Sequence, residues 1–373
     1  MANFSPTIGK IAGIDVQLHW TFILLLLFSL VISLPLFMIF VLLFLFVFLH
    51  ELAHSITAKN NNIPVQKIIL YPLGGGSIID MDNIEPRLEF RISLAGPLSN
   101  FFFGFVLGAI VILMPGGFAK SIVQLLFLLN ILLAASNIIP WFPLDGGRIL
   151  RSYLQRKRSF FTSTEITVKV SNVITVLFIL GTFIFVYMSN GYSLLYKETI
   201  VVFDLFIAIF FYGGAQAEMQ SAYVRNYTSD LPLSAVSSKN YIMLKPSVKM
   251  GSLYNEMLAH HTHLVVFKQG SEFRLVSRLP TVISNKGVGN MIKKDISYFS
   301  SPLPVISYNA KPFQALTKMQ VYESGIIGIV KGGKLIGIIQ RQHLESVLSL
   351  HISKSSKLSK APRSSKTSNS KSV

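Results

Sequence analysis

The stretch Phe44–Ala58 constrains this chain most, because two histidines and a glutamate stand at the end of a long apolar run. It reads FLFVFLHELAHSITA, and no residue from Pro35 to Leu49 carries a charge. Ionisable side chains in such a setting are costly unless they are partnered, and they mark functional sites by default. The run therefore predicts a membrane helix that ends in a functional centre.

His50, Glu51 and His54 have the H-E-x-x-H spacing. Residues four apart on a helix share a face, so both imidazoles can bind one metal ion. Glu51 is next to His50 and can polarise a water molecule at that ion. The alternative is a chance occurrence of this spacing at the membrane surface, with both histidines hydrogen-bonded to neighbouring groups.

The composition places the chain among membrane proteins with an attached soluble part. Of its 373 residues, 51% are hydrophobic and 14% are charged, and the mean hydropathy is +0.53. A soluble domain carries roughly 25% charged residues. The chain has no cysteine, so a metal ion must be held by nitrogen and oxygen ligands. The net charge of +17 comes without a folded basic face or interleaved aromatic residues, and we expect no binding to nucleic acid.

Apolar segments predict about six membrane spans, of which the first two are separated at Ser33-Leu34-Pro35. The predicted spans are residues 18–34, 36–58, 92–114, 121–141, 168–188 and 199–217. Lysine and arginine residues flank the first pair on both sides, which places both flanks in the cytoplasm. We therefore expect a multi-pass protein of the cell membrane with a cytoplasmic C-terminal region.

Two shorter segments lie beside these spans. Residues 8–18 predict a short amphipathic strand at the membrane interface. Residues 63–82 are apolar but broken by Pro72 and by three glycines, Gly74 to Gly76. This pattern indicates either a re-entrant hairpin beside the bundle or an ordinary surface hairpin. An edge strand within residues 70–79 could hold an extended peptide by adding it to the sheet.

The segment 137–148, NIIPWFPLDGGR, carries a single carboxylate after two prolines. Broken backbone at membrane depth is tolerated beside a watery cavity, so Asp145 is our candidate for the third metal ligand. It could equally be the N-cap of a helix over residues 146–157. Two imidazoles and a carboxylate would leave one position open, as in catalytic zinc sites. Asn137 could donate a hydrogen bond to the substrate backbone or to the developing oxyanion.

Residues 228–350 have an ordinary soluble composition and form two loosely similar halves. Each half predicts the order strand, helix, strand, turn, strand, and the turn of the second half is Lys331-Gly332-Gly333-Lys334. The last 23 residues, 351–373, contain six lysines and arginines and no acidic residue. We expect them to form a disordered basic tail that lies against anionic lipid.

The segments HELAH, YPLGGG, AGPLSN and NIIPWFPLDGG, in this order, resemble the site-2 protease family of intramembrane zinc metalloproteases. The likeness is to the archaeal and bacterial type, which carries a C-terminal pair of CBS (cystathionine-β-synthase-type) domains. It implies a multi-span α-helical protease domain over residues 1–220, with about six transmembrane helices and a membrane-associated β-hairpin. It implies a cytoplasmic α/β CBS-domain pair over residues 228–350.

The resemblance also implies roles for individual residues and for partners. Zinc (Zn²⁺) would be bound by His50, His54 and Asp145, and Glu51 would activate the zinc-bound water. Asn137 would contact the substrate, and the hairpin with Gly74 and Gly75 would guide it. The substrate would be a membrane-spanning protein, cut within the lipid bilayer.

The CBS-like halves depart from that family's pattern. The second half reads GIIQRQH over residues 337–343, where the family has a threonine and an aspartate that hold a nucleotide. We therefore expect no adenosine-nucleotide binding by residues 228–350, and the pair could instead serve for docking or for homodimer formation.

Two other functions remain compatible with the sequence. One is a CBS-regulated membrane transporter or channel that uses the polar groups as an ion path. A carrier of this kind would distribute its polar groups over several spans. The other is a catalytically inactive membrane scaffold. The transporter is weakened because the ionisable membrane residues concentrate at two helix ends. The scaffold is weakened because His50, Glu51, His54 and Asp145 are all present.

Overall fold

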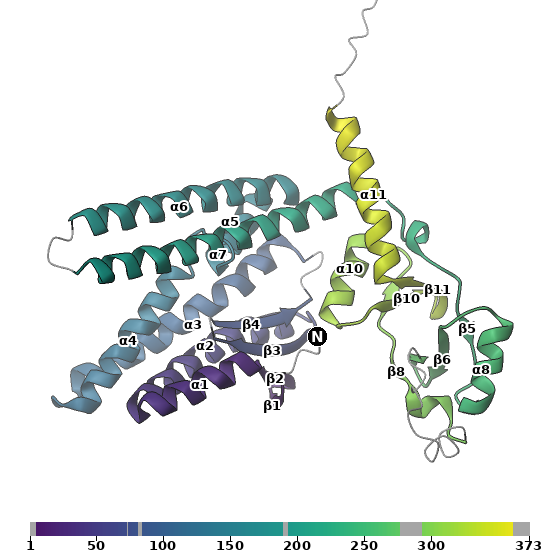
Figure 1. The fold of residues 1–373 in the computed structure, drawn as a ribbon, viewed down its shortest axis with the longest axis horizontal. Helices are drawn as coiled ribbons and strands as arrows, with labels where there is room; N and C mark the ends of the chain where they lie inside the picture. The colour runs from purple at the N-terminus through teal and green to yellow at the C-terminus, as the bar shows by residue number, and fades with distance from the viewer. Residues whose placement is uncertain (1–4, 73, 81–83, 189–192, 277–292, 361–373) are drawn as a thin grey trace, which may run out of the picture. The chain divides into compact units, whose positions relative to one another are not determined.

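The computed structural model describes residues 5–72, 74–80, 84–188, 193–276 and 293–360 (Figure 1). The chain divides into two compact units, Met1–Tyr223 and Val224–Val373. The first unit is mostly helical and carries a small sheet, whereas the second is built from strands and helices in alternation.

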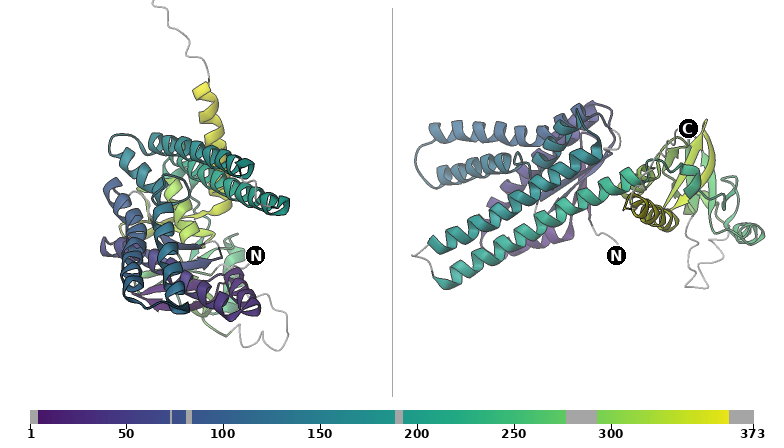
Figure 2. Two further views of the ribbon diagram at one scale, coloured as in Figure 1. Left: turned by 90° about the vertical axis from the view of Figure 1, so that its left-hand side faces the viewer. Right: turned by 90° about the horizontal axis from the view of Figure 1, so that it is seen from above.

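Seven helices begin among the described residues of the first unit. They are α1 (Trp20–Ile32), α2 (Leu34–Asn60), α3 (Pro86–Leu113), α4 (Phe118–Ser136), α5 (Asp145–Gln155), α6 (Phe160–Met188) and α7 (Leu194–Tyr227). Figures 1 and 2 show α6 and α7 side by side. Helix α3 packs against both α2 and α4. These contacts make α3 the central helix around which the N-terminal half of the unit is arranged.

Five helices of the described chain are long and apolar enough to cross a membrane, namely α2, α3, α4, α6 and α7. Helix α1 has 13 residues, which gives about 20 Å at 1.5 Å per residue, less than the roughly 30 Å of a hydrocarbon core. The predicted break between α1 and α2 is confirmed, because the Ser33 side chain accepts from the Leu36 amide to cap α2. The number of about six spans remains a prediction.

A four-stranded sheet lies beside α2 in the order β1-β2-β3-β4. Its strands are β1 (Thr7–Ile11), β2 (Ile14–Leu18), β3 (Val65–Tyr71) and β4 (Gly74–Ile79). The predicted hairpin is present as the antiparallel pair β3–β4. The single strand expected over residues 8–18 is instead a second hairpin, because Ala12 and Gly13 both adopt positive φ and reverse the chain. Strand β4 forms an edge of the sheet.

The segment between α4 and α5 folds back tightly on the start of α5. A Cβ atom at Gly146 would overlap the carbonyl oxygens of Ile138 and Ile139, and one at Gly147 would lie 2.5 Å from the Phe142 ring. Only residues without a side chain permit this approach. The two glycines therefore fix where α5 begins, and with it the position of Asp145.

Helix α5 is held to its neighbours by a buried ion network. Arg151 pairs with Glu89 of α3 and, at 2.7 Å, with Glu218 of α7. Arg151 and Glu89 are 6% and 5% exposed. Burial alone lowers the pKa of the Arg151 guanidinium, but the two carboxylates outweigh it and raise that pKa above its ordinary value. The cation therefore joins three helices.

The second unit, Val224–Val373, contains two halves in which strands and helices follow the same order. In the first half, β5 (Ile242–Met243) is followed by α8 (Met250–Ala259), β6 (Val265–Gln269) and β7 (Glu272–Val276). Strand β6 pairs parallel with β5 and antiparallel with β7. In the second, β9 (Val305–Ser307), α10 (Pro312–Val321), β10 (Ile326–Lys331) and β11 (Lys334–Gln340) repeat this pattern. The short strand β8 (Ser301–Pro302) and two 3₁₀ turns, η1 (Leu233–Val236) and η2 (Ile296–Phe299), complete the unit before the final helix.

Two predictions for this unit can be assessed. The hairpin turn is confirmed, since Gly332 and Gly333 have φ of 56° and 72°, as a type I′ turn requires. The tail begins later than expected, because α11 (Arg341–Lys360) makes residues 351–360 helical. No glycine or proline interrupts this segment, so the helix can continue. Residues 277–292, which belong to the first half, and residues 361–373 lie outside the described residues.

The ion network generates a stability prediction. Replacing Arg151 with leucine leaves Glu89 and Glu218 without their cation, and breaking a buried pair in this way costs about 3–5 kcal/mol. Arg151→Leu should therefore lower the midpoint of thermal unfolding in detergent. The control is Lys169→Leu, whose ion pair with Glu165 is exposed on α6 and should contribute little. Equal midpoints for the two variants would contradict a stabilising role of the network.

Candidate metal centre

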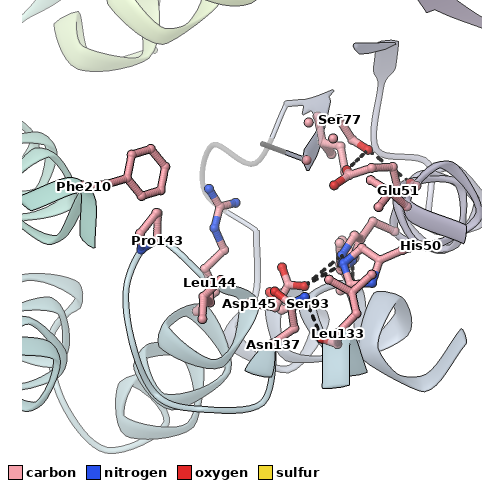
Figure 3. Close-up of a pocket in the computed structure, with 18 residues that line it drawn as sticks. His50, Glu51, Ser77, Ser93, Leu133, Asn137, Pro143, Leu144, Asp145 and Phe210 are labelled. Carbon is pink, nitrogen blue, oxygen red and sulfur yellow. Dashed lines mark hydrogen bonds and ion pairs between the residues drawn. The ribbon is translucent and has the colours of Figure 1, made fainter. Parts of the chain in front are cut away.

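Two helices bring three potential metal ligands together. His50 and His54 lie one turn apart on α2, and each is 6% exposed. Asp145 is the first residue of α5. Its Oδ2 atom lies 3.0 Å from Nε2 of His50 and 3.2 Å from Nε2 of His54, and the two Nε2 atoms are 3.1 Å apart (Figure 3). The predicted residues thus converge at one point.

This donor set fits a zinc ion. Among the described residues it is the one group of three histidine or acidic side chains with ligand atoms close enough to share a metal. Nδ1 of His54 lies 2.6 Å from the Ile92 carbonyl, which can only accept, so Nδ1 carries the proton and the Nε2 lone pair points to the cluster. Two imidazoles and one carboxylate leave a coordination position open, as catalytic zinc requires.

Asp145 does not act as an N-cap. Leu144 occupies the N-cap position of α5, and the Asp145 carboxylate faces the histidines instead of the helix amides. Burial raises the pKa of this carboxyl, but in the metal-free site the positive charge of protonated imidazoles outweighs it and holds the pKa well below its usual range. The carboxylate is therefore ionised and able to bind a cation.

Gly96 of α3 makes the close packing at the centre possible. A Cβ atom there would overlap the Nε2 atoms of both His50 and His54. The sequence Ala95-Gly96-Pro97 indicates that α3 approaches a neighbour closely, but it does not identify the neighbour. The structure shows that the neighbour is the histidine pair.

Strand β4 holds Glu51. The Ser77 hydroxyl donates to Oε2 of Glu51 at 2.6 Å, and Ser77 itself accepts from Ser55 at 3.1 Å. A Cβ atom at Gly75 would lie 2.5 Å from Cγ of Glu51. Ser77 could not be recognised from the sequence, because only the packing of β4 against α2 brings it to Glu51. The one feature of the sequence that could have pointed to Ser77 is its position directly after Gly74-Gly75-Gly76.

A cavity of about 330 Å³ opens at this centre. Gly74, Gly75 and Asn137, the predicted substrate-binding residues, all line it. The Asn137 side-chain amide donates to the Leu133 carbonyl at 2.9 Å, and Phe210 of α7 lies across the cavity from Glu51 (Figure 3). The cavity therefore combines the three-residue cluster, the candidate base Glu51 and the edge strand β4.

Known proteins resemble this chain over most of its length. The model of peptidase family M50 matches residues 38–119 and 115–182. A zinc metalloprotease of Methanocaldococcus jannaschii is 31% identical over 362 residues, which are 93% of this chain and 97% of that protein. The protein Rip3 of Mycobacterium tuberculosis is 30% identical over 171 residues, 40% of this chain and 44% of its own. The solved structure of a site-2 protease from Methanocaldococcus jannaschii covers 58% of this chain and 95% of its own, with 33% identity and a TM-score of 0.43.

The packing of α3 against His50 and His54 predicts that a methyl group added at Gly96 will weaken zinc binding. Gly96→Ala should displace one or both imidazoles, because the new Cβ would occupy their Nε2 positions, and zinc bound per chain after dialysis should fall clearly below the wild-type value. The control is Gly181→Ala on α6, where a Cβ meets nothing within 4 Å. Full zinc occupancy in Gly96→Ala would contradict the close approach of α3.

Proposed function

The chain belongs to peptidase family M50, the site-2 protease family, and we propose that the cavity at His50, Glu51, His54 and Asp145 is its active site. The enzyme is a zinc-dependent intramembrane metalloendopeptidase, and its substrates are membrane proteins in lipid. The observation that carries the assignment of the site is that three donor atoms lie within 3.2 Å of one another in a cavity that the Glu51 carboxylate also lines.

His50, His54 and Asp145 would hold the zinc ion. Zinc supplies a positive charge that polarises the scissile carbonyl and lowers the pKa of a water molecule toward about 7. The protein's part is to keep the three donors fixed and dehydrated. Burial of both histidines, the bond from His54 to Ile92 and the close approach of Gly96 all serve this end.

Glu51 would be the catalytic acid and base. Its carboxylate lines the same cavity and is next to the ligand His50. It can take a proton from the attacking water and pass it to the leaving amine. Ser77 donates to one oxygen of Glu51, so the other oxygen can face the water. Ser77 is thus a positioning residue for Glu51.

The substrate would bind as an extended segment along β4. This strand is an edge of the sheet, and Gly74 and Gly75 line the cavity. An unpaired edge can receive an added strand through main-chain hydrogen bonds. Asn137 could donate to the substrate backbone after turning away from Leu133. A transmembrane helix would have to unwind locally before it could bind in this way.

The remaining assignments concern the rest of the chain. We propose a multi-pass membrane topology with the C-terminal region in the cytoplasm, supported by the apolar helices and by the basic segment 148–158. We also propose a protease domain over residues 1–220, a CBS-like pair over residues 228–350 and a basic tail after α11. The repeated order of strands and helices in the second unit supports the pair. Homodimer formation through it, and the lack of nucleic-acid binding, remain predictions.

The transporter and scaffold alternatives are not favoured. The chain belongs to a family of zinc metalloproteases. The ionisable residues of the centre converge on one cavity, an arrangement that suits a single metal site rather than a path across the bilayer.

Two substitutions separate the proposed roles. Glu51→Gln removes the base and keeps the ligands, so zinc content should stay near the wild-type value while cleavage of a membrane-spanning substrate falls about 10²–10⁴-fold. Asp145→Ala removes a ligand, so zinc content should itself fall. Zinc is measured by atomic emission, and cleavage by gel in detergent or liposomes. Full metal occupancy in Asp145→Ala, or normal cleavage by Glu51→Gln, would contradict these roles.

A further inference from the structure

Five exposed basic residues lie at the start of α3 and just after α5. They are Arg87 and Arg91 of α3, and Arg156, Lys157 and Arg158, which follow α5. None of the five forms an ion pair with a described residue. The other two arginines of α5, Arg148 and Arg151, both pair with Glu218. The proposed chemistry gives the five cations no role.

The Arg156 guanidinium joins the two groups of cations. Its Cζ atom lies 5.3 Å from the centre of the Phe90 ring on α3 and 5.5 Å from the centre of the Tyr153 ring on α5. Phe90 directly precedes Arg91, and Arg87 lies one turn before Arg91 on the same face of α3. The rings hold the guanidinium in place but leave its charge without a counter-ion. The five residues therefore form one surface, which we call the basic patch.

Few acidic groups oppose the basic patch. In the described segments 84–92 and 153–159 the acidic residues are Glu85 and Glu89. Glu89 is buried and bound to Arg151. Glu85 is thus the one exposed carboxylate of these segments set against five cations. The basic patch therefore carries a net positive charge and attracts anions.

The basic patch lies at the ends of helices that cross the membrane. Both α3 and α6 are long and apolar enough to do so. Helix α3 starts at Pro86 and α6 at Phe160, so both helices begin beside the basic patch. The neighbouring Tyr153 is 59% exposed, and exposed tyrosine rings are typical of the membrane–water interface. A lipid headgroup suits this position better than a soluble anion.

We propose that the basic patch binds the phosphate of an anionic phospholipid. Arginine suits this ligand, because the planar guanidinium can donate two parallel hydrogen bonds to phosphate oxygens. The headgroup would bridge the start of α3 and the end of α5. Asp145 begins α5 about 16 Å away along the helix axis. A bound lipid would thus hold the far end of the helix that carries the third metal ligand.

Lipid retention by the full-length protein tests this binding. The protein is purified in neutral detergent and placed in micelles with equal amounts of phosphatidylglycerol and phosphatidylcholine, and bound lipids are counted by native mass spectrometry. Wild type should retain at least about fivefold more phosphatidylglycerol, which is the effect of a single basic residue near an anionic lipid surface. The preference should fall between about 50 mM and about 500 mM salt, since salt screens exposed charges.

Charge removal locates the binding on the protein. Arg87→Gln/Arg91→Gln/Arg156→Gln removes three of the five cations, and its preference for phosphatidylglycerol should fall toward onefold. The midpoint of thermal unfolding in detergent shows whether this variant is folded. If the loss of the ring contacts of Arg156 unfolds it, Arg87→Gln/Arg91→Gln tests the same surface without changing those contacts, and its preference should fall below that of wild type.

The matched control is Lys245→Gln/Lys268→Gln/Lys334→Gln. It makes the same change in net charge at three exposed lysines of the second unit, and it should keep the wild-type preference. Equal loss in the control and in the patch variant would overturn the inference, because the preference would then follow net charge alone. An unchanged preference in the patch variant would overturn it as well.

Two competitors separate the lipid from other anions. Inorganic phosphate and a tetraglutamate peptide, each at the concentration of the lipid, should leave the bound phosphatidylglycerol in place. Displacement by phosphate would indicate a site for free phosphate, and displacement by the peptide a site for an acidic protein; either would overturn the lipid assignment. Zinc-depleted protein should show the same preference as wild type, so the outcome is independent of the proposed active site.

Discussion

The Asp145 carboxylate is partly buried, with 18% of its side chain exposed, beside the imidazoles of His50 and His54, and the arrangement of the first unit depends on this contact. A carboxylate in an apolar interior is costly unless cationic or hydrogen-bonding partners compensate for its lost hydration. A metal ion shared by the three side chains provides that compensation and at the same time the chemistry of hydrolysis. The partly buried charge is thus retained because of its function.

Several features act together to keep this contact in place. Gly146 and Gly147 let the preceding loop pack against α5. Arg151 then joins α5 to α3 and α7 through buried ion pairs. Gly96 allows α3 to lie directly against the two imidazoles. The helix that begins with Asp145 is therefore positioned by elements that make no contact with substrate.

The sequence predicted those parts of the site that depend on local spacing. His50 and His54 share a helix face because of their four-residue separation, and the hairpin β3–β4 follows from its turn residues. The sequence did not predict Ser77 or the contact of Gly96 with the histidines, because both depend on how separate elements pack. The hairpin at residues 7–18 was missed because Ala12, with φ of 51°, is an unusual turn residue. The helix beyond residue 350 was missed because its polar composition resembles that of a disordered tail.

The most direct test of the central claim is the X-ray absorption spectrum of zinc bound to the purified wild-type protein. Zinc held by His50, His54 and Asp145 should have nitrogen and oxygen neighbours at about 2.0–2.2 Å, together with the more distant scattering of two imidazole rings. The chain has eight histidines, so other sites are chemically available. A spectrum with three or more imidazoles, or with none, would contradict a centre built from His50, His54 and Asp145.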